Sequence, residues 1–406
     1  MNMNKIPSIS FLLGSGISLA SGMPSVSTIT NAIQSYYGKS INELRDLSIA
    51  GIGGRDLLDA IDLIETIDSY IRSLSSPLSV NYEDIYELLN VYTERTGFQS
   101  SEIPISNMAF IKELKEFFSR KKEKSISNRI VSNAKRIIES IVKKHIPINP
   151  QSINGLDFLT KITKNVLGDI DILTLNHDYV LETDLKENGI PFEDGMIENG
   201  DIFKWEENGY FDQNRHKTSI LKLHGGIDWE VLAYYTDNGS LTDLQIGIVK
   251  SMEVENVPLH IKGIPYDRIG KNLTRDFLSA FITGKRSKAI RYNMSYFSDI
   301  FSTMGRLLKK HNLLVIAGYG FSDDAINHRI RHWFNLDENR KIVVFIKDEN
   351  TLEGVGNILG IPYIKTSNRI KNFSKFPNEY ETDGSLKQLI SEIISFSQIE
   401  EPQGAA

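Results

Sequence analysis

The sequence has no cysteine among its 406 residues. Without thiols the chain can form no disulfide and offers no thiolate ligand for zinc or iron–sulfur clusters. It also has no uninterrupted run of the roughly 18 apolar residues that a membrane-spanning helix needs. Excess positive charge is absent too, because the formal net charge is −6. We therefore expect a cytoplasmic protein that contacts no membrane and does not bind nucleic acid directly.

The overall composition is that of a globular protein, with 40% hydrophobic and 24% charged residues. At roughly 150 residues per domain, the length allows two or three domains. The stretch from Lys5 to Gly22 weakly imitates a secretory signal, but serines and glycines interrupt its apolar part. We interpret it as a buried strand that runs into a glycine turn.

Short apolar runs bounded by turn residues predict the strands of one sheet. They lie at 9–13, 170–175, 219–223, 313–317 and 342–346, with a weaker run at 361–364. Continuous Ile, Leu and Val runs suit strands that are buried on both faces of a parallel sheet. Helical periodicity fills several intervals, for example 296–310. The fold class that follows is α/β, with a doubly wound, Rossmann-like parallel sheet.

The interval between the first two predicted strands is far too long for an ordinary crossover. Its apolar residues recur at mostly helical spacing, as at Leu57, Ile61, Ile64 and Ile67. We therefore predict a large helical insertion after the first strand. The predicted domains are residues 1–30 and 165–370 for the Rossmann domain, 31–164 for the insertion, and 371–406 for a C-terminal helix and disordered tail. A loop-rich stretch at 236–285 is predicted to be a lid.

The insertion carries a basic segment at 111–145, with 11 Lys and Arg residues against 4 Glu. Such a segment could face an acidic partner, a nucleotide activator or nucleic acid. A solvated helix face explains it equally well, because its two aromatic residues, Phe117 and Phe118, stand together and are not interleaved with the basic residues for stacking on bases.

A glycine motif follows the first predicted strand, with the sequence Gly14-Ser15-Gly16-Ile17-Ser18 and a further glycine at Gly22. Glycines there let the backbone turn tightly and bring N–H groups onto a pyrophosphate, at the N-terminus of a following helix. The spacing is not that of the Rossmann fingerprint, and no acidic residue follows about 20 residues later. A tight turn without a ligand therefore remains an alternative.

Two polar motifs follow the next strands, at the sheet edge where open α/β proteins bind their ligands. The first is Asn176-His177-Asp178, for which a helix cap is the alternative explanation. The second is His224-Gly225-Gly226, in which the histidine could act as a general base. A structural histidine bonded to a loop carbonyl is the alternative there.

A fourth motif, Gly318-Tyr319-Gly320-Phe321-Ser322-Asp323-Asp324, follows the 313–317 strand. Its glycines would let a nucleotide lie close to the backbone, and Ser322 or Asp323 would cap the next helix. The two acids could bind a metal, but we favour the cap. His328 and His332 stand four residues apart, yet Arg329 and Arg331 would repel a cation, so we expect no metal site.

Together these four motifs, in this order, resemble the sirtuin family over residues 7–30 and 165–366. They are more similar to the sirtuin-like NAD-consuming effectors of prokaryotic anti-phage defence than to the protein deacylases. The resemblance implies that Asn176, Asp178 and His224 are catalytic, with His224 as the base. It further implies that NAD is held by a set of residues from the two glycine motifs, namely Gly14, Ser15, Gly16, Ile17, Ser18, Gly22, Gly318, Tyr319 and Phe321.

Two departures from the family pattern bear on the activity. Sirtuin deacylases carry a four-cysteine zinc ribbon, which this chain cannot form. The Phe-Arg pair that usually follows the first motif is replaced by Ser25-Val26. The resemblance therefore implies hydrolysis of NAD⁺ to nicotinamide and ADP-ribose. A catalytically silent NAD- or ADP-ribose-binding subunit and an NAD-dependent deacylase or ADP-ribosyltransferase remain the alternatives.

An NAD hydrolase that is always active would kill its host, so we expect an off state and a trigger in abortive infection. The partners we expect are NAD⁺ itself and a second copy of the chain in a homo-oligomer. A separate activator protein or a small nucleotide ligand is a further candidate.

Overall fold

A computed structural model describes most of the chain. The described residues are 8–44, 47, 52–74, 80–95, 108–121, 128–147, 150–199, 202–212, 216–235, 241–251, 275–281, 295–361, 364–365 and 367–398. The predicted disordered tail at 400–406 lies outside them.

The chain divides into two compact units. The first comprises residues 1–23, 147–282 and 289–406, and the second comprises 24–146 and 283–288. The predicted insertion, 31–164, differs from the second unit because residues 147–164 cluster with the first. The described residues of the predicted C-terminal segment, 371–398, cluster with the first unit.

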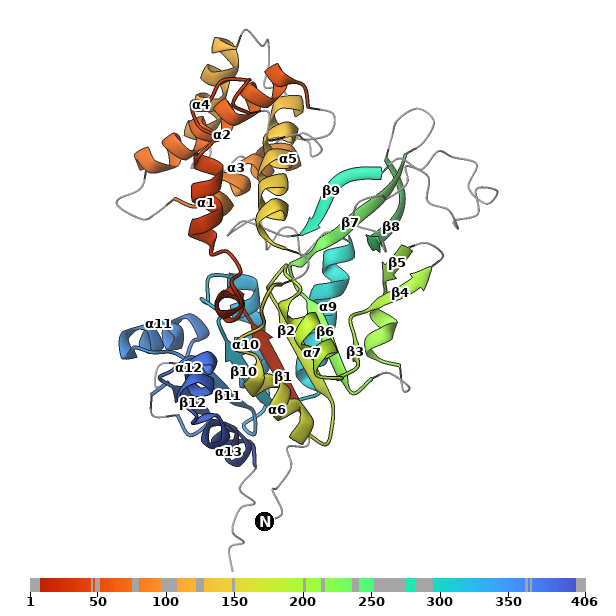
Figure 1. The fold of residues 1–406 in the computed structure, drawn as a ribbon, viewed down its shortest axis with the longest axis vertical. Coiled ribbons are helices and arrows are strands. Elements are labelled where there is room, and N and C mark those ends of the chain that lie inside the picture. Colours follow the sequence, from red (N-terminus) through yellow and green to blue (C-terminus); the bar gives the residue numbers. More distant parts are fainter. Residues whose placement is uncertain are drawn as a thin grey trace, which may run out of the picture. The chain divides into compact units, whose positions relative to one another are not determined.

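The first unit is built on a seven-stranded parallel sheet in the order β12-β11-β10-β1-β2-β6-β3 (Figure 1). Its strands include β1 (Ile9–Leu13), β2 (Ile170–Thr174), β6 (Thr218–Lys222), β10 (Leu313–Ala317) and β11 (Lys341–Phe345). These confirm the five main strand predictions to within a residue. Every residue of β1, β2, β6 and β10 is buried, as continuous apolar strands covered on both faces require.

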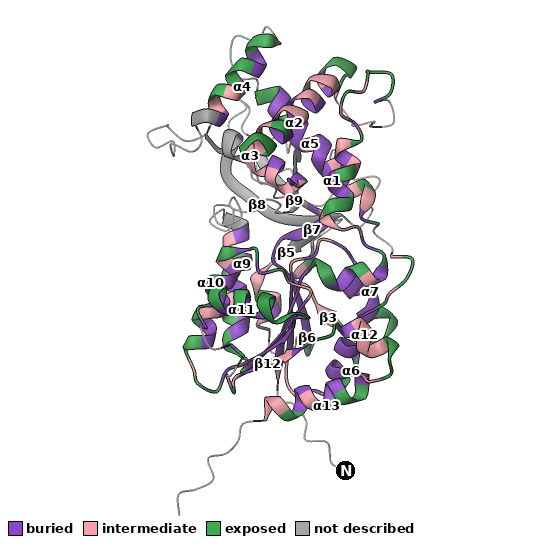
Figure 2. Cartoon of the chain, turned by 90° about the vertical axis from the view of Figure 1, so that its left-hand side faces the viewer, coloured by how far each residue is buried: buried purple, intermediate pink, exposed green. Residues whose placement is uncertain are grey.

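Helices cover both faces of this sheet, which confirms the doubly wound fold class (Figure 2). One face carries α9 (Ser295–Lys309), α10 (Asp324–Asn335) and α11 (Glu349–Leu359). The other carries α6 (Asp157–Asn165), α7 (Val180–Glu187), α12 (Pro377–Thr382) and α13 (Leu386–Ser397). The position of α9 confirms the helix predicted at 296–310.

The sheet continues past the point that the sequence suggested. The weak strand predicted at 361–364 is not found at Ile361 and Ile364, the two of its residues that the structure describes: Ile364 lies in a turn, and the edge strand is β12 (Ile370–Phe373). A polar residue, Asn372, sits within β12, so its pattern lacks the continuous apolar run of the inner strands. Edge strands need no such run.

A second sheet in the first unit was not predicted. It is antiparallel, in the order β4-β5-β8-β7-β9. The strand that precedes it in the chain, β3 (Phe192–Glu193), belongs to the seven-stranded sheet. Its strands are β4 (Met196–Asn199), β5 (Ile202–Trp205), β7 (Gly225–Tyr235), β8 (Leu241–Ser251) and β9 (Arg275–Phe281). The loop-rich lid expected at 236–285 is therefore wrong over β8 and β9, and the rest of it lies outside the described residues.

The second unit consists of packed helices. They are α1 (Val26–Gln34), α2 (Gly54–Leu74), α3 (Tyr82–Arg95), α4 (Met108–Arg120) and α5 (Asn128–His145). The apolar stripe predicted on α2 is buried, with Ile61 and Ile64 fully inaccessible and Ile67 nearly so. Helix α5 contributes a matching stripe that includes Ile130 and Ile137. None of the helices in the described part of the chain has the length and apolar character to cross a bilayer.

Candidate active site at the carboxyl edge of the parallel sheet

The strand order places β1 between β2 and β10, so the chain leaves β1 toward one half of the sheet and later returns to build the other. Open α/β sheets bind ligands at such a switch point, beyond the carboxyl ends of the strands. All four sequence motifs follow strands of this sheet and thus meet at this edge.

The two glycine motifs pack backbone against backbone at the switch point. The Gly16 N–H donates to the Gly318 carbonyl at 3.0 Å. Gly318 has a φ of +68°, and a Cβ there would lie 2.4 Å from the Ile17 nitrogen. A Cβ on Gly14 would lie 2.5 Å from the Gly318 oxygen. Glycine at these positions is therefore required by the close approach of the two loops, whatever else they bind.

The helix expected after the first motif is a seven-residue 3₁₀ helix, η1 (Ser15–Ser21). Gly22 ends it with a φ of +79° and donates its N–H to the Leu19 carbonyl at 3.0 Å. Ser15 and Gly16 are exposed, whereas Ile17 and Ser18 are buried. The motif thus exposes its N-terminal backbone and turns the Ser18 side chain toward the β2 loop.

Asn176 ties the first two motifs together. Its side-chain Nδ2 donates to the Gly14 carbonyl at 3.1 Å and to the Ser18 hydroxyl at 2.9 Å. The residue is only 8% exposed. Among the described residues, nothing donates a hydrogen bond to its buried Oδ1. A buried carbonyl acceptor without a donor costs free energy and calls for an explanation.

Asp178 lies on the same loop and is also buried. Its Oδ1 accepts the Val180 N–H at 3.1 Å. The N-cap residue of α7 is Tyr179, which makes no side-chain cap hydrogen bond, so helix capping does not explain the motif. Burial raises the pKa of the Asp178 carboxyl above its ordinary value, against the lowering effect of Lys222 and of hydrogen bonds from Val180 and Ser18.

A buried ion pair, Lys222 with Glu182, holds the loop that contains Asp178. Lys222, the last residue of β6, lies 2.8 Å from Glu182 of α7, and each side chain is 4% exposed. The same ammonium donates to the Asp178 carbonyl and lies over the Tyr179 ring. The pair therefore joins the end of β6 to the first turn of α7. Sequence reasoning missed it, although a lysine ending an apolar strand was a visible signal.

His224 follows β6 and is 5% exposed. Its Nε2 lies 3.1 Å from Oδ2 of Asp323, so it faces a carboxylate at that nitrogen and not a loop carbonyl. The histidine near a loop carbonyl is His177, whose Nδ1 lies 3.2 Å from the Gly225 oxygen. The two imidazole rings lie 6.2 Å apart between centroids. Sequence reasoning singled out His224 but missed both neighbours as parts of its environment.

Asp323 caps α10, as predicted, by accepting the N–H groups of Ala325 and Ile326 through Oδ1. The Tyr319 hydroxyl lies 3.1 Å from the Asp323 carbonyl and 2.9 Å from Oδ1 of Asn327. Burial, with the nearby Asp323 charge, raises the pKa of the Tyr319 phenol, so it stays neutral.

Phe321 has a left-handed φ of +54°, and the Asn327 amide donates to its carbonyl at 2.8 Å. A non-glycine residue in that region stores strain.

The structure thus gathers every predicted catalytic residue and both glycine motifs at one edge. Hydrogen bonds link Asn176 to the first motif and Asp323 of the fourth motif to His224. Metal ligands are not gathered in the same way: the described residues contain no cluster of three or more His, Asp or Glu side chains that could hold an ion. His328 and His332 are both exposed on α10.

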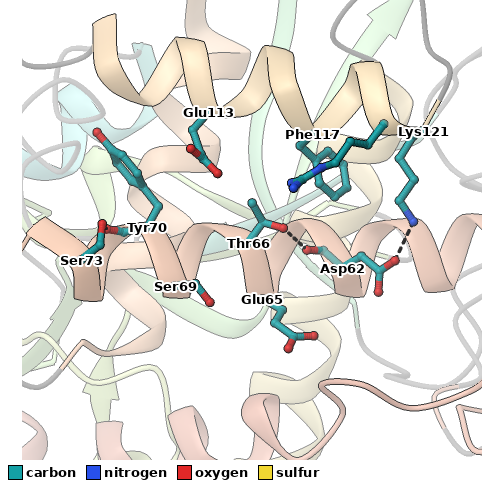
Figure 3. A pocket seen from close by; sticks show the side chains of 10 residues that line it. Asp62, Glu65, Thr66, Ser69, Tyr70, Ser73, Glu113, Phe117 and Lys121 are labelled. Carbon is teal, nitrogen blue, oxygen red and sulfur yellow. Dashed lines mark hydrogen bonds and ion pairs between the residues drawn. The ribbon is translucent and has the colours of Figure 1, made fainter.

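A groove of about 770 Å³ lies elsewhere, between α2 and α4 of the second unit (Figure 3). It contains none of the predicted site residues. Lys121, from the basic segment, pairs there with Asp59 at 2.7 Å and Asp62 at 2.6 Å. Arg129 pairs with Asp56 in the same way. Part of the positive charge of the basic segment is therefore neutralised by carboxylates of α2.

Comparisons with known proteins bear on the first unit. The sequence matches no curated protein. Solved structures that resemble the fold include a Sir2 homologue in complex with NAD, with 11% identity, coverage of 96% of this chain and 91% of that chain, and a TM-score of 0.37. Another is a mutant Sir2 homologue in complex with ADP-ribose, with 10% identity, coverage of 97% and 94%, and a TM-score of 0.35.

A family model described as a SIR2-like domain matches residues 171–357. The match takes in Asn176, Asp178, His224 and the whole fourth motif, whereas the first glycine motif precedes it. Residues 171–357 of this chain are therefore similar to a SIR2-like domain.

Proposed function

We propose that the protein is an NAD⁺ glycohydrolase, which cleaves the nicotinamide–ribose bond to give nicotinamide and ADP-ribose. The proposal is supported by the sirtuin-like motifs, by the SIR2-like domain and by their meeting at one sheet edge. The lack of cysteine excludes the four-cysteine zinc ribbon of the deacylases and so favours hydrolysis over deacylation.

The observation that carries the proposal is the buried acceptor on Asn176. Its Nδ2 is fixed by Gly14 and Ser18, so the amide cannot turn, and Oδ1 has no donor among the described residues. The carboxamide N–H of nicotinamide, a ribose hydroxyl and water are all suitable donors. A substrate of this kind would remove the cost of the unpaired acceptor.

Cleavage of the nicotinamide–ribose bond does not require a strong general acid. The nicotinamide nitrogen is already cationic, so the leaving group departs as a neutral molecule, through an oxocarbenium-like state as in other glycoside cleavage. What the enzyme must do is orient the carboxamide, stabilise positive charge on the ribose and admit water. In our proposal Asn176 and Asp178 orient nicotinamide and water, and His224 accepts a proton.

We further propose that NAD⁺ loss serves anti-phage defence by abortive infection and that the enzyme needs a trigger. This part of the proposal rests on the resemblance of the four motifs to prokaryotic defence effectors. It predicts low turnover by the protein alone and higher turnover in the presence of lysate from infected cells.

The test is nicotinamide release from NAD⁺ by the purified full-length protein, with and without phage-infected lysate. We expect His224→Ala to lower turnover by roughly 100-fold or more, the range that general acid–base catalysis contributes. Asn176→Ala should lower it by about 100-fold as well, because nicotinamide and water lose their orientation. His328→Ala, an exposed histidine on α10, serves as the control and should turn over like the wild type.

Two results would count against the proposal. Turnover by His224→Ala that matches the wild type would remove the catalytic assignment. No turnover under any condition, with NAD⁺ still raising the melting temperature, would indicate a catalytically silent binding subunit.

A further inference from the structure

We infer that Asp323 is a positioning residue for His224, that it holds the imidazole as the Nε2–H tautomer, and that Nδ1 is consequently the nitrogen that accepts a proton. The catalytic part of this inference rests on the proposed function. The tautomer itself does not, and it can be measured without any turnover.

The inference is supported by the Asp323 carboxylate, whose two oxygens have different partners. Oδ1 of Asp323 accepts the N–H groups of Ala325 and Ile326 at 3.1 and 3.2 Å, which fixes the carboxylate at the start of α10. Oδ2 then faces His224 Nε2 at 3.1 Å. Asp323 is 2% exposed and His224 is 5% exposed, so water screens the contact only weakly.

An ionised carboxylate has only acceptors, so the hydrogen in this contact belongs to His224 Nε2. The hydrogen bond made by one ring nitrogen decides the protonation of the other, which makes Nδ1 the basic atom. The Asp323 backbone is held in turn by Tyr319, whose hydroxyl accepts the Asp323 N–H at 3.3 Å. Asp323 is therefore held at the start of α10, while His224 lies just after β6.

In the proposed step, a water molecule gives its proton to Nδ1 of His224 while its oxygen forms a bond to C1′ of the ribose. The bond between C1′ and the nicotinamide nitrogen breaks, and its electron pair stays on nicotinamide. His224 becomes an imidazolium next to the Asp323 carboxylate, which stabilises that charge, and the proton later passes to solvent.

Asp323→Asn tests the inference because the helix cap dictates how the new amide must turn. Only the amide oxygen can accept the Ala325 and Ile326 N–H groups, so the NH₂ group must face His224. An amide donor at that point forces Nε2 to be the acceptor and moves the histidine proton to Nδ1. The variant thus keeps the cap and reverses the tautomer.

Asp323→Ala acts in the opposite way. It removes the cap, so it should be the less stable variant, but it leaves His224 able to adopt either tautomer. We expect the order of turnover to be wild type, then Asp323→Ala, then Asp323→Asn, with Asp323→Asn about 10- to 100-fold below wild type in kcat and little changed in KM. The order of melting temperature should instead place Asp323→Asn near wild type and Asp323→Ala lowest.

The direct readout is nitrogen NMR of ring-labelled histidine in the full-length protein. The chain has eight histidines, and the His224 signals are identified by their loss in His224→Gln. We expect the Nε2–H pattern in wild type and the Nδ1–H pattern in Asp323→Asn. His311, whose Nε2 lies 2.6 Å from Asp171 in the core, should keep one pattern throughout. Asp324→Asn is the matched control for charge removal on the same helix turn.

An unchanged His224 pattern in Asp323→Asn would overturn the inference, as would turnover that follows stability through the series. A wild type without any turnover would instead overturn the proposed function, while the NMR result would still decide the role of Asp323.

Discussion

At the scale of single residues, the glycines of the two motifs show how sequence signals for ligand binding can have a second cause. Gly14, Gly16 and Gly318 each bring one loop into backbone contact with the other. Gly320, two residues further on, has open space around it and no positive φ. The fourth motif thus contains one glycine that packing requires and one that packing does not.

This difference gives a stability prediction. Gly318→Ala should lower the free energy of unfolding by about 3 kcal/mol, because its Cβ meets the Ile17 nitrogen and the residue has a positive φ. Gly320→Ala should change it by less than about 0.5 kcal/mol. Urea unfolding of both variants measures the difference. Equal effects would mean that the two loops do not approach as closely as described.

Asp178 allows a prediction with pH. Its pKa is raised in the folded protein, chiefly by burial, so folding becomes less favourable as the pH rises above the unfolded value of about 3.9. Asp178→Asn removes that cost and its amide oxygen can still accept the Val180 N–H. We expect a higher melting temperature than wild type near pH 7 and a gain that vanishes toward pH 4. A gain independent of pH would contradict the burial explanation.

At the scale of elements, the inner strands of the parallel sheet were predictable because burial on both faces leaves a continuous apolar run. Strands β1 and β10 match their predicted bounds. Edge strand β12 did not stand out, because an edge needs no such run and Asn372 interrupts it. The antiparallel strands β8 and β9 were missed because the sequence at 236–285 was interpreted as loop-rich.

The burial of the inner strands also explains why part of the candidate site was predictable from the sequence. Polar residues directly after buried strands identified Asn176, Asp178 and His224, because parallel strands end at a common edge. Sequence could not show which of them touch. The contact between His224 and Asp323 joins residues 99 positions apart, and it depends on where α10 begins and on which carboxylate oxygen caps it.

At the scale of the whole molecule, all of the candidate site belongs to the first unit, although its parts are far apart in sequence. The glycine motif at 14–22 precedes segment 24–146 of the second unit, and the other three motifs follow that segment. The helices of the second unit have their own buried core, in which Ile61 of α2 and Ile137 of α5 are fully inaccessible. A ligand at the sheet edge should therefore stabilise one unit directly.

This gives a prediction for hydrogen exchange measured by mass spectrometry with ADP-ribose, the product-like ligand. Ligand at 100 times its dissociation constant should slow exchange through unfolding of the first unit by about 100-fold, equivalent to about 2.7 kcal/mol. Peptides from β1, β2 and β10 should show this slowing, and peptides from α2 and α5 should not, because their opening does not release the ligand. Inorganic phosphate is the control for a general anion effect. Equal slowing in both units would mean that they unfold together, and no slowing in either would mean that the strand-end motifs do not bind this ligand.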